Sequence, residues 1–207
     1  MASNLDRVGV LGHGLFGSAL CDLLEDAGFS TVAWDPHSEV PQHRAGTALQ
    51  HTVEGARFVI LATPVEAQHE TLEAIRAVLK PEQIVFDVGS VKTEPEKWMA
   101  ELLGDEIPWV ATHPLFGPHS LAQGERPLRV VVCPNTRHPE SVRAVEGLFR
   151  QLGCKVISQE ADEHDRAMAE AHALGFFIAK GLLDTGATFE SEAVPPSAQG
   201  LGRLIHA

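Results

Sequence analysis

Three glycines stand where an apolar run meets an amphipathic segment, and this junction constrains the fold more than any other feature of the chain. The run Val8–Leu11 is compact and apolar, which is typical of a buried strand. It leads directly into Gly12-His13-Gly14-Leu15-Phe16-Gly17. Apolar residues at helical spacing follow, namely Leu20, Leu23, Leu24 and Ala27. The sequence therefore predicts a strand, a tight glycine turn and a helix, an arrangement that can hold the phosphates of a nucleotide.

Strand-like and helix-like runs alternate along most of the chain. The expected strands are Val8–Leu11, Thr31–Trp34, Phe58–Ala62, Ile84–Val88, Trp109–Thr112 and Arg129–Cys133. The expected helices are Leu15–Ala27, Val65–Leu79, Pro95–Leu103, Glu140–Leu152 and one long helix over Asp162–Leu183. Such alternation is typical of a mostly parallel sheet with helices on both faces. The predicted fold class is α/β, a Rossmann-type doubly wound domain over residues 1–159, followed by a short helical segment over residues 160–207.

Charge and composition exclude several classes of partner and site. Acidic residues outnumber basic ones by 28 to 16, which gives a formal net charge of −12. Nucleic acids and anionic membranes bind basic surfaces, so neither is expected as a partner. Cys21, Cys133 and Cys154 are scattered, and neither they nor the histidines have metal-ligand spacing. We therefore expect buried thiols, no metal and, because residues 1–7 lack a secretory leader pattern, a cytoplasmic protein.

Asp35 follows the second expected strand, where a carboxylate can accept hydrogen bonds from the hydroxyls of an adenosine ribose. A 2′-phosphate would meet like charge there, and no Arg or Lys follows directly, so the predicted cofactor is NAD and not NADP. In the glycine turn, the first glycine permits the turn, the second lets pyrophosphate approach the backbone, and the third lets helix and strand pack closely. The predicted cofactor contacts are Gly12, Gly14, Leu15, Phe16, Gly17, Asp35, Thr63 and Pro64. Thr63-Pro64 fits equally well as a turn that only ends a strand.

Two later segments carry candidate chemistry. They are Asp87-Val88-Gly89-Ser90-Val91-Lys92 and Thr112-His113-Pro114-Leu115-Phe116-Gly117-Pro118. Both follow strands, at the edge where open α/β sheets bind ligands. A histidine held between a strand and a proline-rich turn is well placed as a general base near neutral pH, although a lone histidine at a strand end is more often structural.

Four motifs together resemble one enzyme family. They are GHGLFG, DVGSVK, THPLFGP and EHDRAMA, in this order, and with their surroundings they cover nearly all of residues 7–184. The chain resembles the prephenate/arogenate dehydrogenases of tyrosine biosynthesis. The resemblance implies NAD-dependent oxidative decarboxylation of an anionic cyclohexadienyl acid. Hydride leaves the ring carbinol carbon for NAD, and the ring carboxylate leaves as CO₂, which gives 4-hydroxyphenylpyruvate or tyrosine.

The resemblance also implies roles for individual residues. His113 would be the catalytic base that engages the ring hydroxyl. Ser90 would assist it by contacting the hydroxyl, the histidine or the nicotinamide end of the cofactor. Lys92 would contact a substrate carboxylate or remain a solvated surface lysine. We interpret His164, in the fourth motif, as structural.

Members of this family continue into a larger helical domain, which builds the dimer and supplies an arginine for the substrate's side-chain carboxylate. Here the sequence stops at Ala207. Arg203 loosely matches the region of that arginine, and Arg126 and Arg129 are other candidates. The apolar helix over residues 173–183 would leave an exposed patch, so we expect a homodimer that packs through it.

Two other functions fit part of the pattern. A short Rossmann reductase, related to the β-hydroxyacid dehydrogenases or imine reductases, would share the glycine turn and the long helix. Neither group carries the H-P-x-F-G-P motif, and the first relies on a catalytic lysine. An inactive NAD-binding protein is the other alternative, and it would bind NAD without turning over prephenate or arogenate.

Overall fold

The computed structural model describes residues 7–186 and all their side chains except those of residues 172 and 173. The chain divides into two compact units, Met1–Asp162 and Glu163–Ala207. Each unit is described by itself below. Arg203 lies outside the described residues, so its predicted role in binding the substrate stays a prediction.

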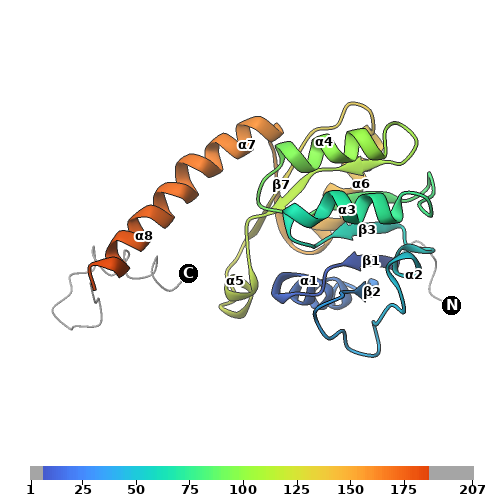
Figure 1. Cartoon of the computed structure of the whole chain (residues 1–207), viewed down its shortest axis with the longest axis horizontal. Coiled ribbons are helices and arrows are strands. Elements are labelled where there is room, and N and C mark those ends of the chain that lie inside the picture. Colours follow the sequence, from blue (N-terminus) through green and yellow to red (C-terminus); the bar gives the residue numbers. More distant parts are fainter. Residues whose placement is uncertain (1–6, 187–207) are drawn as a thin grey trace. The chain divides into compact units, whose positions relative to one another are not determined.

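The first unit contains a five-stranded parallel sheet with the order β2-β1-β3-β4-β5. Figure 1 labels β2, β1 and β3, which lie next to one another in this order. Its strands are β1 Arg7–Leu11, β2 Ser30–Trp34, β3 Phe58–Leu61, β4 Ile84–Asp87 and β5 Trp109–Val110. The helices between them are α1 Leu15–Asp26, α2 Leu49–Val53, α3 Val65–Ile75 and α4 Thr93–Leu102. Every residue of β3 and β4 is buried, as expected for parallel strands that are covered on both faces. The predicted α/β class and Rossmann-type architecture are confirmed.

The two faces of this sheet carry separate hydrophobic clusters, because successive side chains of a strand point to opposite faces. Ile60 of β3 belongs to a buried cluster with Leu24 of α1 and Phe149 of α6 (Pro139–Gln151). Its neighbour Leu61 belongs to a second buried cluster with Leu72 of α3. On this second face, α3 and α4 pack side by side (Figure 1).

A second sheet of three strands follows β5 in the same unit. Its strands are β6 Thr112–Pro114, β7 Leu128–Val132 and β8 Cys154–Ser158, with the short helix α5 Pro118–Ala122 between β6 and β7. β6 pairs antiparallel with β7, and β8 pairs parallel with β7. The prediction of one strand over Trp109–Thr112 is wrong. The chain changes sheets at Ala111, so Thr112 and His113 pair with β7 in place of a neighbour in the first sheet.

A long helical segment ends the described chain. It consists of α7 Ala161–Met168, a π-helical turn over Ala169–Ala173, and α8 Leu174–Asp184. The predicted long helix is therefore present, with a change of hydrogen-bonding pattern near its middle. Such π-turns inside α-helices are uncommon.

Two further features of the described residues bear on the sequence predictions. All three cysteines are buried and free, as expected. None of the helices among residues 7–186 is both long and apolar enough to span a membrane.

Candidate functional site

The loops that carry the predicted cofactor residues leave the same edge of the first sheet. β1 lies between β2 and β3, with Leu11 opposite both Trp34 and Leu61, and Leu61 is opposite Asp87 of β4. The glycine turn and the segments beginning at residues 35, 62 and 88 therefore emerge side by side. The chain leaves β1 for β2 on one side and crosses to β3 on the other. This edge is thus a topological switch point, where open α/β sheets bind ligands.

The glycine turn is shaped by two close approaches within the protein. Gly12 has φ of 103°, and a Cβ there would lie 2.5 Å from the carbonyl oxygen of Ala62. A Cβ on Gly17 would lie 2.2 Å from the carbonyl oxygen of Gly12, so α1 could not approach β1 as it does. Gly14 differs, because a Cβ there would have no protein atom within 4 Å. The missing side chain at Gly14 leaves room at the start of α1 that no protein atom uses.

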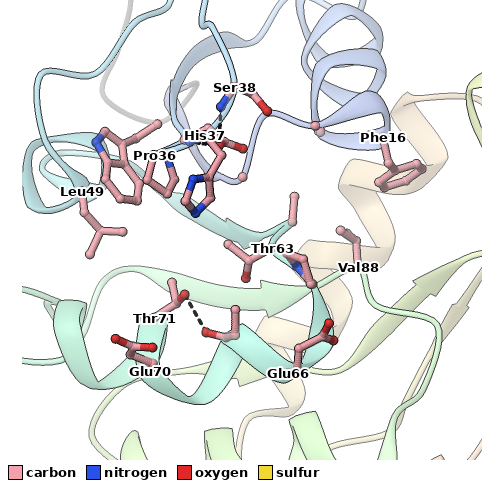
Figure 2. A pocket seen from close by; sticks show the side chains of 18 of the residues that line it. Phe16, Pro36, His37, Ser38, Leu49, Thr63, Glu66, Glu70, Thr71 and Val88 are labelled. Atoms are coloured by element: carbon pink, nitrogen blue, oxygen red, sulfur yellow. Dashed lines mark hydrogen bonds between the residues drawn. The ribbon is translucent and has the colours of Figure 1, made fainter.

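A cleft of about 840 Å³ opens next to the glycine turn. The predicted cofactor residues Gly12, Gly14, Leu15, Phe16, Gly17, Asp35, Thr63 and Pro64 all line it, whereas Ser90, the candidate for the nicotinamide end, does not. Figure 2 shows its two walls, with His37 and Leu49 across the cleft from Thr71 of α3. Phe16 and Val88 lie together at the other end (Figure 2). The cleft is thus an elongated space between the glycine turn, the loop after β2 and α3.

Sequence reasoning missed the cleft residues that come from other segments, among them Trp34, His37, Leu49, Glu70, Thr71, Ala74 and Val88. Their positions depend on the packing of α2 and α3 against the loop after β2. Only three of them had a signal that could have been used: Trp34 and His37 lie within two residues of Asp35, and Val88 lies inside the Asp87–Lys92 motif.

Asp35 directly follows the end of β2, and three backbone N–H groups hold its carboxylate. His13 donates to Oδ2 at 2.6 Å, and His37 and Ser38 each donate to Oδ1 at 2.8 Å. Partial burial by itself would raise the pKa of Asp35, but these three hydrogen bonds outweigh it and hold the pKa below its ordinary value. The carboxylate is therefore charged and fixed beside the glycine turn.

The residues of the cleft fit a dinucleotide. No side chain caps the N-terminus of α1, whose N–H groups and helix dipole therefore remain available to a phosphate. The buried hydroxyl of Thr63 has no hydrogen-bond partner among the described residues, and it lines the cleft. Together with the space above Gly14, these groups would suit a phosphate next to a fixed carboxylate.

The predicted chemical residues lie apart from the lining of this cleft. His113 lies in β6 with 7% of its surface exposed, and Ser90 is exposed in the loop between β4 and α4. A direct link joins the two regions, because the ring of Phe116 packs on that of Phe16 with centroids 5.9 Å apart. Phe16 lines the cleft, and Phe116 follows His113 in the same motif.

Lys92 lies in the interior of the first unit. It is not a solvated lysine, because its side chain is completely buried. Its ammonium group donates to Oδ2 of Asp87 and to the carbonyl oxygen of Thr112. Asp87 is equally buried, and this burial raises the pKa of its carboxyl against the opposing effect of Lys92. A direct contact between Lys92 and a substrate carboxylate therefore has no support in the structure.

The other candidates are less closely tied to the site. Arg126 and Arg129 are both exposed, and Arg126 precedes a cis peptide bond to Pro127. His164 is fully buried, with Nδ1 2.8 Å from a carboxylate oxygen of Asp165. Its burial and pairing agree with the structural role expected for it.

Comparison with known proteins places the chain in one family. The family described as "Prephenate dehydrogenase, nucleotide-binding domain" matches residues 40–158. The chain is 32% identical to a 4-amino-4-deoxyprephenate dehydrogenase of Streptomyces pristinaespiralis over 188 residues, which cover 86% of this chain and 58% of that protein. It is 24% identical to an arogenate dehydrogenase of Arabidopsis thaliana, with coverage of 86% of this chain and 30% of that protein. The chain thus spans less than two thirds of the length of either relative.

Solved structures agree on the fold. The crystal structure of prephenate dehydrogenase from A. aeolicus, in complex with hydroxyphenyl propionate and NAD+, has a TM-score of 0.77 at 19% identity. The similarity covers 100% of this chain and 79% of that one. With a family match over more than half of its residues, the chain belongs to the prephenate dehydrogenase family and contains that family's nucleotide-binding domain.

Proposed function

We propose that this protein catalyses the NAD-dependent oxidative decarboxylation of prephenate or arogenate. The observation that carries the proposal is the arrangement of two motifs at one edge of the first unit. A nucleotide-binding cleft contains the glycine turn and Asp35, and Phe16 and Phe116 connect it to the segment that bears His113. Family membership and the names of the relatives support this substrate class.

The proposed cofactor is NAD. Three N–H donors already hold the Asp35 carboxylate in its charged form, so a ribose hydroxyl would find a strong acceptor there. A 2′-phosphate would meet the same negative charge. Pro36, His37 and Ser38 follow Asp35, and none of them offers the permanent positive charge that a 2′-phosphate requires.

The proposed reaction assigns chemical roles to His113 and Ser90. His113 accepts the hydrogen bond of the ring hydroxyl and stabilises positive charge on that group as hydride leaves its carbon. When bound, the nicotinamide accepts that hydride. The electron pair of the broken bond to the ring carboxylate then completes the aromatic ring, CO₂ departs, and the hydroxyl proton ends on the phenol oxygen. Ser90 is assigned to orienting the hydroxyl or His113.

The test is NADH absorbance with purified protein, NAD⁺ and either prephenate or arogenate, with NADP⁺ in parallel. We expect turnover with NAD⁺ on at least one substrate. His113→Asn should lower kcat by about two to four orders of magnitude, the range that general acid–base catalysis contributes, with an unchanged Kd for NAD⁺. His119→Asn, which changes an exposed histidine in α5, serves as the control and should leave kcat unchanged.

Activity on 3-hydroxy acids or imines, without activity on prephenate or arogenate, would replace the proposal with a Rossmann reductase of another class. Binding of NAD⁺ with no turnover of either substrate would also contradict it and would identify an inactive nucleotide-binding protein. Near-normal turnover by His113→Asn would remove this residue from the mechanism.

We also propose that the protein is a homodimer that packs through α8, in the segment over residues 160–207 that we assign to dimerisation and substrate binding. Phe176 and Phe177 are 78% and 80% exposed, and Leu174 and Leu183 are more than half exposed. Apolar side chains gathered on one helix in this way usually mark an interface. Light scattering should give twice the chain mass, and replacing both phenylalanines with serine should shift the protein to monomer. A monomer at micromolar concentration for the unchanged chain would contradict the dimer.

A further inference from the structure

A fully buried ion pair lies beneath the segments that carry Ser90 and His113. Asp87 is the last residue of β4, and Lys92 stands at the N-terminal boundary of α4. Neither side chain has any exposed surface. Besides its bond to Asp87, the Lys92 ammonium donates to the carbonyl oxygen of Thr112, which is itself completely buried.

Thr112 completes this cluster through two further bonds to Asp87. Its backbone N–H donates to Oδ1 of Asp87 at 3.1 Å, and its hydroxyl donates to the backbone carbonyl of Asp87 at 2.5 Å. Asp87 also accepts a bond from the N–H of Gly89 at 2.9 Å. These contacts join residues 25 positions apart, at the point where the chain passes from the first sheet to the second.

The cluster is bonded to the chain next to both proposed catalytic residues. The carbonyl bound by Lys92 belongs to the peptide bond between Thr112 and His113, so its orientation sets the backbone from which the imidazole projects. Ser90 lies in the short loop that runs from Asp87 to Lys92, and the ion pair closes this loop at its base. Gly89 restricts the loop further, because a Cβ there would lie 2.8 Å from Val65 of α3.

Stability by itself gives little reason for such a pair. Desolvating two charges costs about as much as their attraction returns, and well-packed apolar side chains are often equally stable in such positions. A buried ion pair is better explained when it makes the chain adopt one arrangement in preference to others. Here the selected arrangement is the approach of the loop after β4 to the start of β6.

We propose that Lys92 and Asp87 are positioning residues, which act through Thr112 and the loop at Ser90 to set the mutual geometry of Ser90 and His113, and that Lys92 does not bind the substrate carboxylate. The proposal rests on the proposed function only for its catalytic readout. The effect of the ion pair on the positions of Ser90 and His113 is expected whether or not the chain turns over prephenate.

The test compares Lys92→Met, the double variant Asp87→Asn/Lys92→Met, and Lys97→Met in the full-length protein. The double variant removes both charges together and keeps the folded state accessible if the single variant unfolds. Lys97→Met removes the same charge from the exposed side of α4, where the Lys97 ammonium lies 3.8 Å from a carboxylate oxygen of Glu94, and it serves as the matched control.

We expect the double variant to bind NAD⁺ within about twofold of the unchanged protein. Its kcat should fall at least tenfold with little change in KM for the substrate, because geometry and not substrate affinity is lost. A rise in KM with unchanged kcat would show a substrate ligand and overturn the proposal. So would a kcat that, per folded molecule, equals that of Lys97→Met, since the pair would then be purely structural.

An NMR measurement keeps the test independent of activity. The ring signals of His113, assigned with His113→Asn, should shift in the double variant, while those of the exposed His119 should stay in place. If the unchanged protein proves inactive on prephenate and arogenate, the proposed function fails, but these signals still decide the positioning role. An unchanged His113 spectrum in the folded double variant would overturn it.

Discussion

At the scale of single residues, the glycine motif contains two kinds of position. Gly12 and Gly17 are required by the protein itself, because a Cβ on either would lie 2.5 Å or less from a backbone oxygen. Gly14 has an extended backbone with φ of −69°, which any residue can adopt, and open space where its side chain would be. Folding therefore requires glycine at positions 12 and 17, whereas at position 14 the requirement comes from the ligand.

This difference predicts opposite outcomes for two substitutions. Gly14→Ala should change the free energy of unfolding by no more than about 0.5 kcal/mol, as at other open surface positions, yet weaken NAD⁺ binding at least tenfold. Gly17→Ala should destabilise the fold by about 1–3 kcal/mol, the range for overpacking. Urea denaturation and calorimetric titration with NAD⁺ measure both quantities. Unchanged NAD⁺ affinity in Gly14→Ala would place the pyrophosphate elsewhere.

Asp35 predicts a specific dependence of stability on pH. Its folded-state pKa lies below the ordinary 3.8, so the carboxylate contributes stability above that value and loses it as pH falls through the folded-state pKa. Asp35→Asn has one acceptor oxygen for three donors, so it should lose about 1 kcal/mol at pH 7. The deficit should shrink below about pH 4. Denaturation across pH measures it, with the exposed Asp26→Asn as control; a deficit that does not vary with pH would contradict the assignment.

At the scale of elements, α5 and the loop before it connect the chemical segment to the cofactor cleft. Contacts join α1 to α5, and the Phe16–Phe116 ring pair lies at this contact with an interplanar angle of 51°. Phe116 is only 8% exposed and belongs to the hydrophobic cluster on the α1 face of the sheet. The position of this segment is therefore coupled by packing to a residue that lines the cleft.

Phe116→Ala should test this coupling. Removing a buried ring costs about 3–5 kcal/mol in well-packed cores, and we expect a value near the lower end because the residue retains some exposure. NAD⁺ binding should weaken several-fold, since Phe16 loses the ring that supports it. Lys97→Ala, on the exposed side of α4, should affect neither quantity. Normal NAD⁺ affinity in the folded Phe116→Ala protein would mean that the ring pair does not shape the cleft.

At the scale of the whole molecule, the first unit contains the complete hydrophobic core found among the described residues. Both buried clusters consist of side chains between Val8 and Ala161. The cleft is also built entirely from this unit, between Gly12 and Val88. In α8, by contrast, only Ala179 is buried.

A chain ended at Asp162 should therefore fold and bind NAD⁺ with an affinity within a few-fold of the full chain. The physical reason is that neither core cluster nor any cleft-lining residue is removed. Circular dichroism with thermal unfolding checks the fold, and titration with NAD⁺ checks the site. Loss of cooperative unfolding would show that the second unit contributes to the stability of the first.

Local sequence patterns account for the features of the protein that short stretches of chain encode. Apolar runs, helical periodicity and the three glycines act within a few residues, so they predicted the alternation of strands and helices and the cofactor side of the cleft. Asp35 was expected beside the glycine turn for the same reason, because it directly follows a strand that pairs with β1, and its contact with a ribose stays a prediction.

Features that depend on residues far apart in the sequence could be seen only in the packed fold. Lys92 looked like a surface lysine because its partner Thr112 lies 20 positions away and belongs to another sheet. The break at Ala111 was hidden because a buried run has the same composition whichever sheet it joins. Leu49 enters the cleft through the packing of α2 against its neighbours. Burial and long-range pairing are properties of the packed chain, and local sequence patterns do not encode them.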